Sequence, residues 1–175
     1  NDMLFFLSEN RLVDLIKLYL GDNLDNLNSM IDSSFKKIKH INIGSNYFCC
    51  EGFEIRSVSF IGEPRKIPMR AFYKCFNLSS ISIPSSVILI GESAFADCFH
   101  LEQISIPSSV VLIEKDAFNG CTGLRQVSFD AHSSLTNIED GAFQECSDLK
   151  QITIPSSVTI IGPSVFFKCN SLEQV

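Results

Sequence analysis

Apolar and polar positions repeat along most of this chain with a period of 23 residues. The stretch I-P-S-S-V-I-L-I-G-E-S-A-F-A-D-C-F-H-L-E-Q-I-S at residues 83–105 is written again, almost letter for letter, at 106–128. A third copy follows at 129–153, a fourth begins at 154, and a degenerate copy precedes them from about residue 60. A fixed period of this length predicts a solenoid, in which each copy forms one coil and buries its apolar face against its neighbours.

Four apolar columns share the same spacing, with steps of 23, 23, 25 and 23 residues. They are Phe72, Phe95, Phe118, Phe143 and Phe166; Cys75, Cys98, Cys121, Cys146 and Cys169; Leu78, Leu101, Leu124, Leu149 and Leu172; and Ile67, Ile90, Ile113, Ile138 and Ile161. We expect the members of each column to lie above one another at the strand separation of about 4.8 Å.

Within one copy, the spacing of the apolar residues predicts a short strand that ends at a proline. Leu101, Ile104 and Ile106 should point inward, while Glu102 and Gln103 face solvent. Pro107 ends the strand because it has no amide donor. Further along the copy, Ile113 should return to the core from a second short extended segment, and strands of successive copies should pair in parallel.

The third copy is two residues longer than its neighbours. The extra residues fall within Asp130-Ala131-His132-Ser133, where the proline of the other copies is missing. An insertion at a turn is expected to leave the apolar columns in register.

These columns resemble the leucine-rich repeats of the BspA-like, treponemal type, whose unit reads C-x-x-L-x-x-I-x-I-P-x-S-V-x-x-I-G-x-x-A-F. The match covers about residues 55–175. The resemblance implies a solenoid protein of a kind found on the surfaces of bacteria and parasitic protists and associated with adhesion to host components or other cells.

We therefore expect an α/β repeat solenoid, a leucine-rich-repeat array with a parallel β-sheet on its concave face and a helical N-terminal cap. Apolar residues at helical spacing predict the cap over residues 1–37, with Ser8 as an N-cap and Gly21 as a stop. Residues 38–60 should form an irregular first coil, and 61–175 the solenoid of 23-residue units. The alternative for residues 1–37 is a helix that docks in a partner's groove.

Both ends of the chain give the expectation of a longer protein. The sequence begins at Asn1 without an initiator methionine, and Val175 aligns with Ile152 in the middle of a strand. An open solenoid end exposes its core, so we expect further repeats or a cap beyond Val175.

Charge and composition narrow the classes of partner. The net charge of −6 and the absence of a basic stripe argue against nucleic acid. The apolar run Met3-Leu-Phe-Phe-Leu7 is too short for a membrane span, so we expect no membrane insertion within this fragment. We find no recurring serine, histidine and carboxylate, and no glycine-rich phosphate loop, so we expect no enzyme, no catalytic residue and no cofactor.

Seven cysteines raise the alternatives of disulfides and metal. The sequence has no C-x-x-C pair and no histidine at ligand spacing, so we expect no metal site. Stacked cysteines should hold their β-carbons about 4.8 Å apart, outside the roughly 3.5–4.5 Å that a bridge needs. We expect a column of buried, reduced thiols, with Cys49 and Cys50 the only remaining candidates for a bridge.

The concave face supplies the candidate binding residues, which are polar and should face solvent: Arg56, Glu102, Gln103, Arg125, Gln126, Lys150 and Gln151. Glu102 beside Arg125 and Lys150 beside Glu173 place opposite charges on adjacent strands. The alternative is a soluble sheet face whose polar groups satisfy one another. If a ligand binds here, polar and hydroxyl-rich contacts suit a glycan or an extended protein segment.

The opposite face departs from the family pattern, which is usually polar at these positions. Here they are Ile88, Leu89, Val111 and Leu112, which would form an apolar association stripe if they point outward. In the alternative, one residue of each pair turns into the core through a bulge. The stripe predicts self-association or docking of a partner.

Together these observations favour a non-enzymatic binding module for protein or glycan, with surface adhesion as its role and a secreted or cell-surface location. The alternative is an intracellular scaffold that holds other proteins in the cytoplasm. A signal peptide or a C-terminal membrane span in the intact protein would separate the two.

Overall fold

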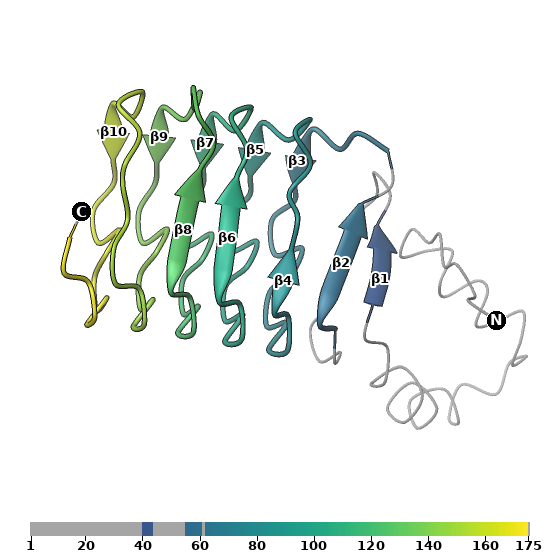
Figure 1. Ribbon diagram of the computed structural model, residues 1–175, viewed down its shortest axis with the longest axis horizontal. Helices are drawn as coiled ribbons and strands as arrows, with labels where there is room; N and C mark the ends of the chain where they lie inside the picture. Colours follow the sequence, from purple (N-terminus) through teal and green to yellow (C-terminus); the bar gives the residue numbers. More distant parts are fainter. Residues whose placement is uncertain (1–39, 44–54, 61, 175) are drawn as a thin grey trace, which may run out of the picture.

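The computed structural model describes residues 40–43, 55–60 and 62–174, which form a row of stacked coils (Figure 1). Every strand pair within these residues is parallel. One face carries all the four-residue strands and the two-residue β4, and we call it the long-strand face: β1 (His40–Ile43), β2 (Ser57–Phe60), β4 (Ser80–Ile81), β6 (Gln103–Ile106) and β8 (Gln126–Phe129). The other face, the short-strand face, carries two-residue strands alone: β3 (Lys66–Ile67), β5 (Leu89–Ile90), β7 (Leu112–Ile113), β9 (Asn137–Ile138) and β10 (Ile160–Ile161).

The two faces differ in continuity. The short-strand face is one sheet in the order β10-β9-β7-β5-β3. The long-strand face is divided into β1-β2-β4 and β6-β8, and single bridges at Gln126, Gln151 and Gln174 continue it toward the last coil. The short-strand sheet is therefore continuous from β3 to β10, and the long-strand face has a break between β4 and β6.

Stacked phenylalanines fill the space between the faces. The ring centroids of Phe72, Phe95, Phe118 and Phe143 follow one another at 5.0, 5.1 and 5.1 Å, and the rings are nearly coplanar, with angles of 14°, 4° and 1°. The rings are almost completely buried. This file confirms the prediction that matching columns stack, and the insertion between Phe118 and Phe143 leaves it undisturbed.

The segment that carries each phenylalanine is a run of turns rather than a helix. Two columns of this run have left-handed backbone: Arg70, Ser93, Asp116, Gly141 and Ser164, and, four residues later, Lys74, Asp97, Gly120, Glu145 and Lys168. Alternate amides bond to the next coil, as when Phe95 N donates to Ala117 O (2.7 Å) and Asp97 N donates to Asn119 O (2.8 Å). An α-helix needs those amides for its own carbonyls and allows no left-handed residue, so the run cannot be helical.

The expected α/β class is accordingly not confirmed, because the described residues contain strands and turns but no helix. The expected helical cap (1–37) and the cysteines Cys49 and Cys50 lie outside the described residues. Of the expected first coil (38–60), the structure describes β1 and β2, which pair in parallel over four residues from His40↔Ser57 to Ile43↔Phe60.

Within the described residues, Cys75, Cys98, Cys121 and Cys146 are buried, as predicted, Cys169 is partly exposed, and none of the five is in a disulfide. Four of these thiols make a contact that the sequence did not reveal. Cys98 Sγ donates to Phe72 O (3.1 Å) and Cys121 Sγ to Phe95 O (3.1 Å), and Cys146 and Cys169 repeat the contact one coil further on each time. The adjacent Cys169 thiol and burial raise the pKa of Cys146 well above its usual range, so this thiol is protonated and unreactive at neutral pH.

Candidate functional site

The predicted charged residues on the long-strand face occupy the position immediately before each long strand. Arg56, Glu102 and Arg125 precede β2, β6 and β8, and all three are exposed, as is Lys150 in the following coil. Arg125 Nη1 lies 3.4 Å from Glu102 Oε2, which confirms this predicted pair, and Arg125 Nε lies 4.0 Å from Asp148 Oδ2. Because the side chains of Arg125 and Glu102 are more than half exposed, these contacts contribute little to stability.

The second predicted pair, Lys150 and Glu173, is joined through the backbone instead. Glu173 N donates to Lys150 O at 2.9 Å, and the side chains form no ion pair among those found in the described residues. The Lys150 ammonium is thus exposed and available to a ligand.

Glutamines form the next column of the same face. Gln103 pairs in register with Gln126, and Gln126 and Gln151 are joined by a further bridge. All three side chains are exposed. The three side-chain amides therefore lie on neighbouring coils of this face and present both donors and acceptors to solvent.

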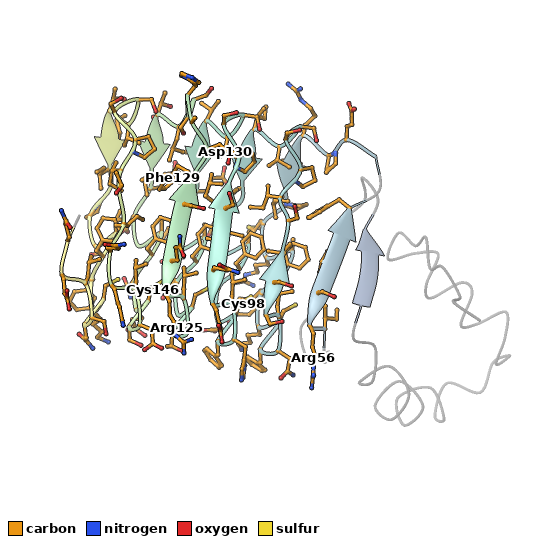
Figure 2. All side chains as sticks on the ribbon, viewed as in Figure 1. Arg56, Cys98, Arg125, Phe129, Asp130 and Cys146 are labelled. Carbon is orange, nitrogen blue, oxygen red and sulfur yellow. The ribbon has the colours of Figure 1, made fainter. Side chains whose placement is uncertain are left out.

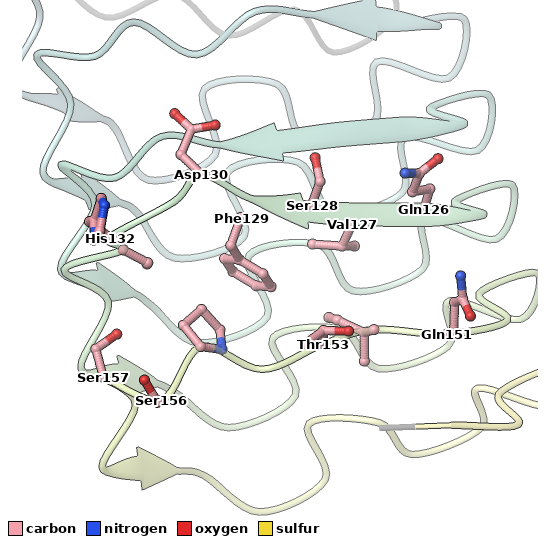
Figure 3. Close-up of a pocket in the computed structure, with 13 residues that line it drawn as sticks. Gln126, Val127, Ser128, Phe129, Asp130, His132, Gln151, Thr153, Ser156 and Ser157 are labelled. Carbon is pink, nitrogen blue, oxygen red and sulfur yellow. The ribbon is translucent and has the colours of Figure 1, made fainter.

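A groove that the sequence analysis did not predict interrupts this face where the insertion lies (Figure 3). It has a volume of about 550 Å³ and lies between the β8 coil and the next one. Residues 126–130, 132 and 133 line one side, and residues 151–153 and 155–157 line the other. β8 pairs with β6 over all four of its residues, but it meets the next coil only at the Gln126↔Gln151 bridge.

The two inserted residues bulge out between fixed points. Asp130 N donates to Ile106 O (3.0 Å) and Ser134 N donates to Ser108 O (2.9 Å), so four residues of one coil span two of the previous coil. His132, in the bulge, has a left-handed φ of 59°. The extra residues make the chain bulge outward at the position where the other copies have a proline.

The groove also leaves one hydroxyl without a partner. In two earlier coils the equivalent serine donates to the preceding coil: Ser86 Oγ to Pro64 O (2.8 Å) and Ser109 Oγ to Val87 O (2.6 Å). The corresponding Ser157 Oγ is buried at the groove and has no hydrogen-bond partner in the described residues. The only sequence signals for this site are the lost proline and the two extra residues, and neither indicates a groove by itself.

The predicted association stripe lies along β5 and β7 on the short-strand face. Ile88 and Val111 are exposed by 39% and 41%, whereas Leu89 and Leu112 are half-buried. The first residue of each pair therefore faces solvent, and the second is partly covered. Ile88 and Val111 are neighbours, since Val111 N donates to Ile88 O at 2.9 Å.

In the part of the chain that the structure describes, no three histidine, cysteine or acidic side chains converge as metal ligands would. Within the same residues, no helix has the length and apolar character that crossing a bilayer requires.

Stacked coils of 23 residues with parallel strands on two faces define a leucine-rich-repeat solenoid (Figure 2). The chain belongs to the family described as BspA type leucine rich repeat region, whose model matches residues 41–173 in six copies. No curated protein matches the chain.

Three solved structures from bacteria are similar over most of this chain. A leucine-rich repeat protein from Bacteroides ovatus is 29% identical with a TM-score of 0.62, and the alignment covers 79% of this chain and 37% of that one. The T. pallidum leucine rich repeat protein is 30% identical with a TM-score of 0.59, covering 77% and 56%. A leucine rich cell surface protein from Faecalibacterium prausnitzii is 29% identical with a TM-score of 0.54, covering 75% and 41%. The chain thus spans little more than half of the T. pallidum protein and less than half of the other two.

Proposed function

We propose that this chain is a non-enzymatic binding module that holds a protein or glycan ligand on its long-strand face and serves adhesion at a cell surface. The observation that carries this proposal is a row of exposed polar side chains at regular spacing, of which Gln103, Gln126, Gln151 and Lys150 are not used by the fold. Family membership supports it, because solenoid repeats present extended binding surfaces.

The location of the protein is part of the same proposal. The Faecalibacterium neighbour is described as a cell surface protein, and the Bacteroides and T. pallidum neighbours share its repeat. The alternative role remains an intracellular scaffold. The ends of the intact protein separate the two, since a signal peptide or membrane anchor is compatible only with the surface.

Adhesion can be measured with fluorescent beads that carry the 175-residue chain, on a monolayer of cultured epithelial cells. Arg125→Ala combined with Lys150→Ala should reduce bead retention by about tenfold, because charged rim residues govern encounter and register. Lys115→Ala is the matched control: it removes an exposed lysine from the segment after β7. Equal retention of all three proteins would contradict binding through the long-strand face.

Self-association through Ile88, Leu89, Val111 and Leu112 is a second proposal. The two exposed β-branched side chains, each immediately before one of the adjacent strands β5 and β7, form a small exposed apolar surface. Ile88→Thr with Val111→Thr keeps the strand propensity and removes that surface. We expect the variant to sediment as a smaller species than the unmodified chain, and identical sedimentation would remove this proposal.

A further inference from the structure

The groove between β8 and the next coil has the chemistry of a small-ligand site. Figure 3 shows Gln126 and Gln151 at the end where the coils bridge, Phe129 in the middle, and Ser156 and Ser157 at the other end. Amides and hydroxyls can each donate and accept hydrogen bonds. A concave site with an aromatic ring and a few convergent polar groups is the usual form of a binding pocket, and this volume lies in the usual range.

Phe129 marks this coil as different from its neighbours. Its column holds isoleucine in the copies on either side, Ile106 and Ile154, and the ring of Phe129 is only partly buried. A ring face carries partial negative charge and attracts the weakly positive C–H edges of a ligand. The fold needs no aromatic residue here, because Ile106 fills the equivalent position completely.

Ser157 shows that the insertion alters the packing at this end of the groove. Its hydroxyl is buried and has no partner within the described residues, whereas Ser109 donates to Val87. An unsatisfied buried hydroxyl is costly, so the insertion lowers the stability of this coil.

The charge of the lining restricts the class of ligand. No lysine or arginine lines the groove, and its ionisable side chains are those of Asp130 and His132. An anionic ligand would find no permanent cation to pair with and would be repelled by Asp130. A neutral ligand with many hydroxyls is the best match for amides, hydroxyls and one ring.

The shape of the groove argues against an extended peptide. A peptide that adds to a sheet edge needs a path along the whole strand and a spacing of about 4.8 Å on each paired side. Here the Gln126↔Gln151 bridge closes one end of the gap. A short, compact ligand can enter, whereas a continuous strand cannot run through.

We propose that this groove binds a neutral oligosaccharide, with a sugar ring on Phe129 and its hydroxyls bonded to Gln126, Gln151 and the exposed hydroxyl of Ser156. The inference rests on the proposed binding role and names the ligand class for one part of the same face. The two-residue insertion then gives this one coil a ligand-binding site that the otherwise similar coils lack.

The test uses the ¹⁵N-labelled 175-residue chain and four trisaccharides. Three are neutral, built from glucose, mannose or N-acetylglucosamine, and the fourth is anionic trigalacturonate. We expect at least one neutral trisaccharide to shift the side-chain amide signals of Gln126 and Gln151, assigned with Gln126→Glu and Gln151→Glu variants, and trigalacturonate to leave them unchanged.

Two variants remove the site without disturbing the core. Phe129→Ile installs the residue of the neighbouring copies and should weaken binding by about tenfold through loss of the ring contact. Asp130→Pro with deletion of Ala131 and His132 restores the sequence pattern of residues 107–110. This shortened variant should close the groove and abolish binding while the chain stays folded. Lys115→Ala, which removes an exposed lysine that does not line the groove, is the control and should bind as the unmodified chain does.

The outcomes separate this inference from the proposed function. The inference is overturned if no neutral trisaccharide shifts the groove amides, if trigalacturonate shifts them instead, or if Phe129→Ile and the shortened variant bind unchanged. In each of these cases the bead assay with Arg125→Ala and Lys150→Ala still decides whether the long-strand face binds anything.

Discussion

Ser109 donates a hydrogen bond from its Oγ to the carbonyl oxygen of Val87 in the preceding coil, at 2.6 Å. The bond fixes one coil to the next, and Ser86 makes the same bond to Pro64. Ser157 occupies the equivalent position after the insertion and makes no such bond within the described residues. The insertion therefore changes the contact between coils as well as the length of one turn.

The first prediction concerns the stability cost of that change. Replacing Asp130 by proline and deleting Ala131 and His132 should let Ser157 bond to the coil before it. Satisfying one buried hydroxyl is worth about 1–3 kcal/mol, which corresponds to a rise in Tm of roughly 2–4 °C per kcal/mol for a chain of this size. Thermal unfolding followed by circular dichroism measures the gain.

The matched control for this prediction is Ser109→Ala, which removes the existing bond and should lower the Tm. If the shortened chain melts at or below the temperature of the unmodified chain, the groove is not a stability defect. Its retention would then need no ligand to explain it.

The second prediction concerns the phenylalanine file. Phe118→Ala should lower the free energy of unfolding by about 3–5 kcal/mol, because it leaves a cavity between two stacked rings in the centre of the array. Phe99 is the matched control. It is also stacked, 5.1 Å from Phe76, but it is 41% exposed, so Phe99→Ala should cost much less. Urea unfolding compares the two, and similar losses would show that burial of the file is not what holds the coils.

The third prediction concerns the thiol column. Cys121→Ala removes the thiol donor to Phe95 O, which keeps its bond from Cys98 N, so the loss of one net hydrogen bond should cost about 0.5–1.5 kcal/mol. Cys121→Ser keeps a donor at the same place and should cost less. The free energy of unfolding in urea distinguishes them. Serine as harmful as alanine would mean that the thiol acts only by filling space.

The repeat pattern predicts the buried columns well, because a column of identical apolar residues reports directly on burial. It correctly places Phe95 above Phe72 and pairs Gln103 with Gln126. The left-handed turns cannot be read in the same way. Their columns hold arginine, serine, aspartate and glycine, so no single side chain marks the backbone angle.

In the candidate site, too, the repeat pattern predicts some features and not others. Exposure of Glu102 and Arg125 follows from strand alternation, and their ion pair follows from adjacency. The partner Asp148 comes from a turn whose path the pattern does not specify. The groove depends on how a two-residue bulge moves one coil relative to the next, and that movement is a property of three-dimensional packing.

The fourth prediction concerns Asp97, which lies in a left-handed turn beside Gly120. A β-carbon at Gly120 would lie 2.5 Å from Asp97 Oδ1, so the carboxyl group sits directly over that glycine. Burial raises the pKa of Asp97 above its ordinary value of 3.8, Lys74 opposes the shift, and Glu145 adds to it. The folded protein thus holds this proton more tightly than the unfolded chain does.

A raised carboxyl pKa lowers stability as the pH rises. Between the unfolded pKa and the higher folded pKa, the folded state binds more protons, so the free energy of unfolding falls across that window and the loss persists above it. Asp97→Asn removes the charge and keeps a residue that tolerates a φ of 61°. We expect the variant to be more stable than the unmodified chain at pH 7, by less than about 1 kcal/mol because the group is partly solvated, and equal to it below the ordinary carboxyl pKa. Urea unfolding at pH 3 and pH 7 tests the sign, and a variant that is less stable at pH 7 would show that the ionised carboxylate stabilises the turn.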